Sequence, residues 1–87
     1  MKIQIDHHTL LRAHERGITD HEISDVIETG RDIPGRHGRR GRYKVYDFPG
    51  EWNGRRYAQK RVEVFFVEDG GVLVTVTAYA FYGEWED

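Results

Sequence analysis

One stretch near the start of the chain carries a histidine and two arginines that could act together on a phosphate. His8, Arg12 and Arg16 follow one another at intervals of four residues, so they share one side of a helix. Histidine titrates near neutral pH without perturbation, and arginine offers bidentate donors to phosphate oxygens. This stripe therefore has the groups for phosphodiester cleavage without a metal. A solvated helix face, with Glu15 paired to Arg12, is the alternative interpretation.

The other histidines lack the spacing of a metal site. Helical zinc pairs need histidines at i and i+4, whereas His7 and His14 are seven residues apart. The chain has no cysteine, which excludes disulfides and cysteine-ligated zinc. It also has neither a P-loop nor a dinucleotide-binding GxGxxG after a strand. We therefore expect no metal and no cofactor.

Positive charge is concentrated in the middle third of the chain, although the formal net charge is only -2. Residues 31–61 hold ten of the thirteen Lys and Arg residues against three acids, so this segment is +7 and the remainder is -9. Such segregation is typical of a protein that binds a polyanion or an acidic partner. A solvated loop, kept mobile by its glycines, is the alternative. The candidate RNA contacts are Arg36, Arg39, Arg40, Arg42, Lys44 and Arg61.

Two helices are predicted in the N-terminal third of the chain, and the first of them would position His8, Arg12 and Arg16. Good helix formers fill residues 7–16, and Gly17 follows, as expected for a left-handed C-terminal cap. Thr19 and Glu22 then have the spacing of a capping box. The second helix runs from this box to about residue 29.

Three strands are predicted in the rest of the chain. Residues 42–48, 60–67 and 72–79 are rich in β-branched and aromatic residues and are separated by glycine-bearing turns. Helices followed by strands predict a single α+β domain over residues 1–87, with two N-terminal helices packed on a three- to four-stranded antiparallel sheet. The acidic, aromatic segment 81–87 is either a last edge strand or a docking segment.

The loop between the last two strands decides which of their side chains share a face. A three-residue loop at 69–71 makes one face wholly apolar, whereas a two-residue loop at 69–70 mixes polar and apolar side chains on both. We therefore predict the three-residue loop. Thr75 and Tyr79 then lie beside Arg61 on a polar face that the helices leave free.

The sequence resembles a widespread bacterial and phage family that is catalogued as a domain of unknown function. Residues 8–19 resemble its His-x3-Arg-x3-Arg-Gly-Ile-[Ser/Thr] opening, and residues 72–76 resemble its terminal Val-Thr-Val strand. The family is similar to RelE/BrnT toxins and to the barnase, EndoU and colicin ribonuclease fold. The resemblance, which spans roughly residues 7–79, implies a metal-independent RNA-cleaving or RNA-binding domain, often paired with an antitoxin. The site residues that it implies are His8, Arg12, Arg16 and Thr75.

Together these observations predict an endoribonuclease of toxin type. His8 would act as general base or acid during attack by a 2′-hydroxyl. Arg12, with Lys44 or Arg61, would neutralise charge on the phosphorus oxygens, and the polar residues of the last strand would orient the phosphate or stack a base. A non-catalytic module that binds RNA or an acidic partner is one alternative. An interaction domain whose arginine loop pairs with the acidic tails of neighbouring copies is another.

The sequence also bears on location and partners. No apolar run approaches the roughly 20 residues needed to cross a bilayer, and residues 1–8 lack the apolar core of a signal peptide. We expect a cytoplasmic protein that makes no membrane contact and whose partners are RNA and an antitoxin. A chain of 87 residues has a thin core, so a homodimer is a further candidate assembly.

Overall fold

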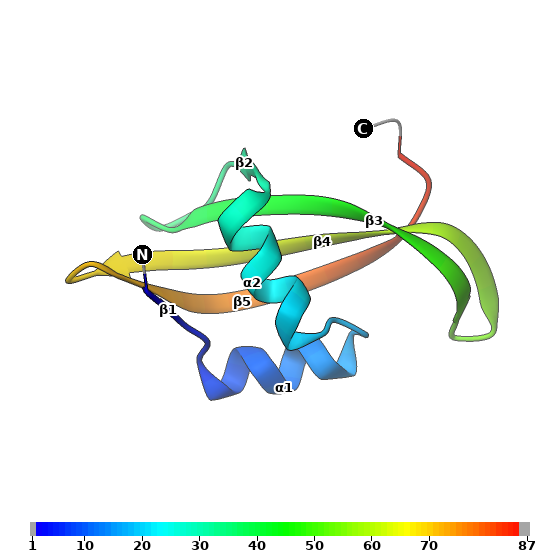
Figure 1. Cartoon of the computed structure of the whole chain (residues 1–87), viewed down its shortest axis with the longest axis horizontal. Coiled ribbons are helices and arrows are strands. Elements are labelled where there is room, and N and C mark those ends of the chain that lie inside the picture. Colours follow the sequence, from blue (N-terminus) through cyan, green and yellow to red (C-terminus); the bar gives the residue numbers. More distant parts are fainter. Residues whose placement is uncertain (1, 86–87) are drawn as a thin grey trace.

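The computed structural model describes residues 2–85, which form two helices and one mixed sheet of five strands (Figure 1). Along the sheet the order is β1-β5-β4-β3-β2, with β1 parallel to β5 and the other neighbours antiparallel. The α+β prediction is confirmed, and two short edge strands, β1 and β2, raise the strand number above the predicted three or four. The elements in chain order are β1 (Lys2–Gln4), α1 (His7–Glu15), α2 (Asp20–Thr29), β2 (Arg31–Ile33), β3 (Arg40–Trp52), β4 (Arg55–Asp69) and β5 (Val72–Gly83).

Both ends of helix α1 are capped, by the Asp6 side chain at the start and by a turn at Gly17 at the end. The Asp6 carboxylate accepts a hydrogen bond from the His8 backbone N–H at 3.0 Å and so caps the first turn. At the other end Gly17 has φ +77°, and the Ile18 N–H donates to the Ala13 carbonyl at 2.8 Å. This is the bonding of a Schellman cap, so the predicted end of the helix is confirmed. Neither helix in residues 2–85 is long and apolar enough to cross a membrane.

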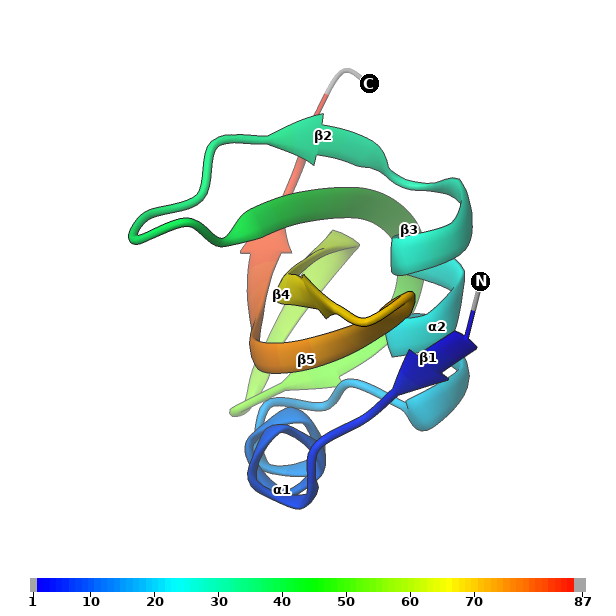
Figure 2. The same cartoon turned by 90° about the vertical axis from the view of Figure 1, so that its left-hand side faces the viewer.

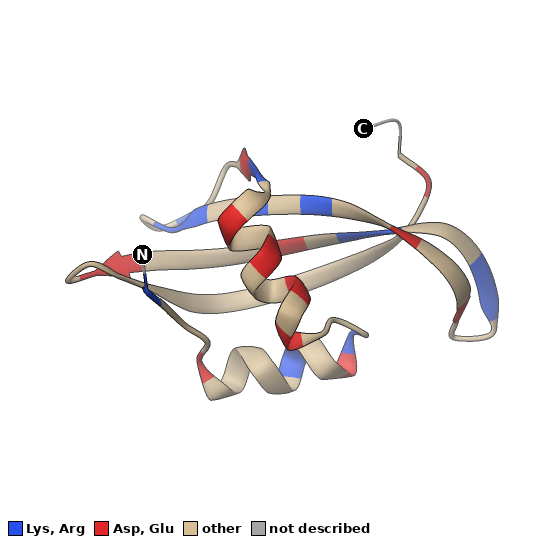
Figure 3. Cartoon of the chain, viewed as in Figure 1, with Lys and Arg blue, Asp and Glu red and all other residues tan. Residues whose placement is uncertain are grey.

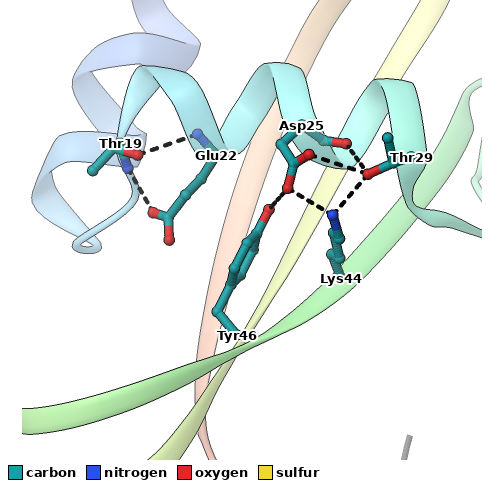
Figure 4. A network of polar contacts seen from close by, with 6 residues as sticks. All are labelled: Thr19, Glu22, Asp25, Thr29, Lys44 and Tyr46. Carbon is teal, nitrogen blue, oxygen red and sulfur yellow. Dashed lines mark hydrogen bonds and ion pairs between the residues drawn. The ribbon is translucent and has the colours of Figure 1, made fainter.

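The start of helix α2 is fixed both locally and by the sheet. Thr19 Oγ1 accepts from the Glu22 N–H at 3.1 Å, and the Thr19 N–H donates to Glu22 Oε1 at 2.9 Å, which confirms the capping box (Figure 4). Lys60, on β4, donates to the same Glu22 oxygen at 2.8 Å and to the Gly17 carbonyl at 2.9 Å. The Lys60 side chain is only 7% exposed. This buried ion pair therefore ties the turn between the helices to the middle of the sheet.

The helices cover one side of the sheet. Helix α2 crosses the sheet face, while α1 lies beside β5 along the edge that β1 leaves uncovered (Figures 1 and 2). The buried core between them consists of Ala13, Ile18, Ile23, Val26, Ile27, Val62, Val64, Phe66, Leu73 and Ala78. We call the other side the open face, because within residues 2–85 no helix covers it. Its central side chains, which alternate with the core residues of β4 and β5, are Arg61, Glu63, Phe65, Thr77, Tyr79 and Phe81.

The hairpin between β4 and β5 differs from the prediction. Its loop consists of Gly70 and Gly71 alone, with φ +58° and +81°. Two consecutive left-handed residues form the type I′ turn that two-residue hairpins favour, and glycine adopts that conformation at no steric cost. The predicted three-residue loop at 69–71 is wrong, because Asp69 pairs with Val72.

A β-bulge in β5 then changes which side chains share a face. Phe66 lies opposite Thr75, and the next pair along the ladder skips Val76. On the turn side of this bulge Thr75 faces the helices and is 3% exposed, whereas beyond it Ala78 takes the inward position. The prediction that Thr75 and Tyr79 share a polar face is therefore wrong. Only Tyr79 lies on the open face.

The β3–β4 hairpin is longer than predicted and reaches the end of α1. Its strands continue to a two-residue turn at Asn53 and Gly54, whose φ values are +51° and +77°. Near this turn Trp52 stacks on Tyr82, with ring centroids 4.9 Å apart. A Cβ at Gly17 would lie 2.7 Å from the Trp52 ring, so only glycine allows this contact.

The aromatic C-terminal segment is partly a continuation of β5. Residues 81–83 extend this strand and pair with residues 59–61 of β4. Because β1 pairs only with residues 72–74, this end of β5 lies at the edge of the sheet, as the edge-strand alternative expects. The Trp85 backbone N–H donates to the Gln59 side chain on β4. Residues 86–87 of the predicted segment lie outside the described residues.

The buried Thr9 hydroxyl gives a stability prediction. Thr9 is fully buried, and its Oγ1 has no hydrogen-bond partner in residues 2–85. Thr9→Val keeps the shape and removes the unsatisfied polar atom, so we expect the free energy of unfolding to rise by about 1 kcal/mol in urea denaturation. In the control Thr29→Val, the lost hydroxyl binds Lys44 and the Asp25 backbone, so stability should fall. A Thr9→Val protein less stable than the parent would contradict this account.

Candidate nucleic-acid interface

The open face carries a short row of aromatic rings. Tyr79 and Phe81 are 39% and 47% exposed. The Tyr79 ring centroid lies 6.0 Å from that of Phe65 and 6.5 Å from that of Phe81. Phe65 and Phe81 were not predicted as site residues. Once the strand register is known, they can be identified from Tyr79: alternation along β5 places Phe81 on the same face, and pairing with β4 places Phe65 beside it. Exposed rings of this kind can stack on nucleic-acid bases.

Arg16 joins helix α1 to this aromatic row. Its Nη1 donates to the Ala78 carbonyl at 2.7 Å, and its guanidinium carbon lies 4.9 Å from the Tyr79 ring centroid. Arg12 and His8 precede it by one and two helical turns, so all three occupy the same side of the helix. Both are exposed, and Arg12 pairs with Glu15 at 3.5 Å, as the alternative interpretation of the stripe expects.

Arg61 contributes a second guanidinium to the open face. It lies over the Tyr43 ring, with its guanidinium carbon 3.8 Å from the ring centroid. Its Nε donates to Glu63 at 3.0 Å, so part of its charge is balanced. The Arg61 side chain is 22% exposed, so part of its guanidinium remains accessible to a base or a phosphate on this face.

The loop between β2 and β3 supplies two more arginines. It projects to the side of the sheet away from α2 (Figure 2). There it closes a groove of about 300 Å³ against the aromatic row. Of the predicted RNA contacts, the structure therefore brings Arg36 and Arg39 to Tyr79, and through Tyr79 to Arg16. The groove is lined by Pro34, Arg36, Arg39, Phe65, Thr77 and Tyr79.

Three other predicted RNA contacts lie on the helix-covered side of the sheet. The guanidinium carbon of Arg40 lies 5.3 Å from the Phe66 ring centroid. Arg42 donates to Asp32 at 3.0 Å and to the Ile27 carbonyl near the end of α2. Lys44 binds α2 as described next. The structure does not bring these three side chains to the open face.

Lys44 belongs to a polar network that fastens α2 to β3 (Figure 4). Its Nζ donates to Asp25 Oδ2 and to Thr29 Oγ1, both at 2.8 Å, and the Tyr46 hydroxyl donates to the same Asp25 oxygen at 2.6 Å. Hydrogen bonds from Lys44 and Tyr46 lower the pKa of Asp25 from 3.8 to about 2. Burial, and then the bond to this carboxylate, raises the pKa of Tyr46 far above its usual value.

Thr75, which the family resemblance implied as a site residue, has a structural contact instead. Its Oγ1 accepts the Asp6 backbone N–H at 2.9 Å, just before α1 begins. This bond ties the start of the helix to β5. The hydroxyl is turned away from the open face and cannot meet a phosphate bound there.

Charge differs between the two sides of the molecule. Helix α2 carries four acids and no Lys or Arg (Figure 3). On the helix-covered side, however, the sheet supplies Arg40, Arg42, Lys44 and Lys60. The open face and its loop carry Arg16, Arg36, Arg39 and Arg61, against Asp47 on β3 and Glu63 and Asp69 on β4. Positive charge without a carboxylate partner is found at the β2–β3 loop, where Arg36 and Arg39 make no ion pair within residues 2–85, so a polyanion would be attracted to this end of the open face.

Neither a metal centre nor a known relative points to a function. Within residues 2–85 no three His, Asp or Glu side chains are grouped closely enough to hold a metal ion. No protein-family model, curated protein or solved structure matches the chain. The chemistry of the open face is thus the basis for a functional interpretation.

The Asp25 network predicts how stability depends on pH. Because the folded pKa of Asp25 is about 2 and the unfolded value is 3.8, the network stabilises the fold fully above about pH 5. This contribution, about 2 kcal/mol, should be lost as the pH falls to 2. Urea titrations between pH 7 and pH 2 should show Asp25→Asn less stable than the parent at pH 7, with the difference shrinking on acidification. Glu28→Gln controls for the change in helix charge. A constant difference would contradict this assignment.

Proposed function

We propose that the open face binds single-stranded RNA. The carrying observation is that Tyr79 and Phe81 are exposed beside guanidiniums from three separate elements, α1, β4 and the β2–β3 loop. Unpaired bases stack on aromatic rings, while arginines contact the phosphates and stack on the bases themselves. The Arg16 guanidinium lies against the Tyr79 ring. A nucleotide whose base stacks on Tyr79 would therefore have its phosphate close to a positive charge.

A relationship with RelE/BrnT-like toxins is part of the same proposal. Two short helices followed by long antiparallel strands agree with what the resemblance of residues 8–19 implies. The resemblance favours RNA over DNA as the ligand and an antitoxin as the protein partner. The place of action would be the cytoplasm, and a homodimer remains the candidate assembly.

Removing the aromatic rings should weaken RNA binding selectively. Tyr79→Leu and Phe81→Leu keep apolar side chains but remove the stacking surface. Stacking contributes about 1 to 3 kcal/mol per base, so each variant should bind about 5- to 150-fold more weakly in fluorescence anisotropy with a labelled, unstructured 12-nucleotide RNA. Leu11→Ala, which shortens an exposed apolar side chain on α1, is the control and should bind like the parent. Circular dichroism checks that each variant is folded.

The RNA affinity measured in this titration should depend on salt concentration. Four arginines at the phosphates predict that log K falls with log salt concentration with a slope of about -3. A DNA strand of the same sequence tests whether the 2′-hydroxyl contributes to affinity. An affinity that is independent of salt, or no binding at 50 mM salt, would refute the proposal.

Cleavage of the bound RNA is a second candidate function, and the position of the helix stripe favours it. Arg16 touches Tyr79, and Arg12 and His8 continue from it along the same side of α1. A strand stacked on Tyr79 therefore has a path toward an imidazole. Thr75 and Lys44 take no part in this version, because both are engaged on the helix-covered side. The remaining groups are His8 as acid or base and Arg12 and Arg16 at the phosphate.

His8→Ala separates cleavage from binding. General acid–base catalysis contributes about 10²- to 10⁴-fold, so the variant should lose cleavage by at least 100-fold in EDTA while RNA affinity changes less than about twofold. His7→Ala is the matched control, because it removes a neighbouring exposed imidazole from a different side of the helix. The products should carry 2′,3′-cyclic phosphates. If the parent does not cleave, or if both variants behave alike, the open face serves binding alone.

A further inference from the structure

We propose that the β2–β3 loop and the aromatic row form a subsite for a single nucleotide. In this subsite Arg36 and Arg39 hold the phosphate, and Phe65 and Tyr79 receive the base. The inference rests on the proposed RNA-binding function and assigns one nucleotide of the strand to a defined place. It differs from that function in naming the groove, the loop and the division of roles between them.

The loop is built as a tight turn that sets its two arginines side by side. The Arg39 N–H donates to the Arg36 carbonyl at 3.1 Å. His37 and Gly38 between them have φ +57° and +76°, the pattern of a type I′ turn. In such a turn the first and fourth Cα atoms lie within about 7 Å of each other. Both guanidiniums therefore start from neighbouring points and can reach the same anion.

Gly35 closes the base of this turn. A Cβ at Gly35 would lie 2.2 Å from the carbonyl oxygen of Arg39, so the two legs of the loop are in backbone contact there. Only glycine permits this approach. Gly35 thus allows the two legs of the loop to approach each other closely. Its position against the sheet follows from β2 and β3, whose pairing includes Ile33 with Gly41.

The groove beneath the loop has the size and lining for one nucleotide. Its volume of about 300 Å³ is at the lower limit for small-molecule sites, so it suits a mononucleotide unit better than a duplex. Phe65 and Tyr79 meet at 71° and offer one ring edge and one ring face. Thr77 adds a hydroxyl to the wall, which can donate to or accept from the edge of a base.

The two loop arginines are available to a ligand. Within residues 2–85 neither Arg36 nor Arg39 makes a side-chain hydrogen bond or ion pair with another residue. Arg40, Arg42 and Arg61, in contrast, each pair with a carboxylate. A phosphate in the groove would therefore displace no internal partner. Guanidinium groups bind phosphate with paired, charge-assisted hydrogen bonds, which this arrangement can provide from two sides.

The direct test uses small probes on the full chain. Nucleoside 5′-monophosphates, the matching nucleosides and inorganic phosphate are titrated against ¹⁵N-labelled protein. We expect the monophosphates to shift the backbone amides of residues 35–39, 77 and 79. The nucleosides should bind at least about tenfold more weakly, because the charge-assisted bonds are lost. Inorganic phosphate that binds as well as every monophosphate would contradict the base-binding half of the proposal.

A pair of double variants tests the loop itself. Arg36→Gln/Arg39→Gln removes two charges from the subsite, and we expect the response to monophosphates to disappear and RNA affinity to fall by about tenfold or more. Arg55→Gln/Arg56→Gln is the matched control, because it removes two charges beside the turn at residues 53–54. The control should retain the response to monophosphates.

The outcomes separate this inference from the proposed function. If RNA binds the parent but Arg36→Gln/Arg39→Gln loses no more affinity than the control pair, the subsite is refuted and the open face still binds RNA through its other residues. If the parent binds no RNA, the proposed function fails and the inference fails with it. Thermal melting of both double variants shows whether a loss of binding reflects a loss of fold.

Discussion

The extra residue in β5 is the constraint on which the rest of the structure depends. On the turn side of the bulge at Val76, Thr75 faces the helices. On the other side of the bulge, Ala78 faces them. Without the bulge, strict alternation would turn Tyr79 and Phe81 toward the core and place alanines outside. Small inward residues let α1 approach β5 closely, and the aromatic rings are left on the open side. One skipped position therefore produces both a packed interior and an aromatic surface.

The cations of the middle third divide between two tasks because strand residues alternate between faces. On β3 and β4 the inward lysines hold the helices, with Lys44 bound to Asp25 and Lys60 bound to Glu22. Arg42 reaches the Ile27 carbonyl near the end of α2, where a positive charge also suits the helix dipole. Two of the four acids of α2, Glu22 and Asp25, thus have partners on the sheet. The arginines of the loop and of the open face do not serve this purpose.

Local signals were predictable from the sequence, and long-range ones were not. The capping box at Thr19 and the cap at Gly17 depend on a few neighbouring residues, and both are confirmed. The register of β4 and β5 depends on a choice of turn and on a bulge, and apolar pairing alone gave the wrong answer for Thr75. Charge counted along the chain suggested one basic surface, but alternation split it. Of the three residues His8, Arg12 and Arg16, only Arg16 has a contact with the open face among the residues that the structure describes.

Arg16 also has a consequence for the thermodynamics of ligand binding. Its guanidinium is held between the Ala78 carbonyl and the Tyr79 ring, and its own carbonyl accepts the Tyr82 hydroxyl at 2.7 Å. The end of α1 and the second half of β5 are thereby joined at three points. A flat ligand that settles on Tyr79 meets a ring whose orientation is already set, so little side-chain entropy is lost on association. The proposed binding surface is preorganised by the same contacts that fix the end of α1.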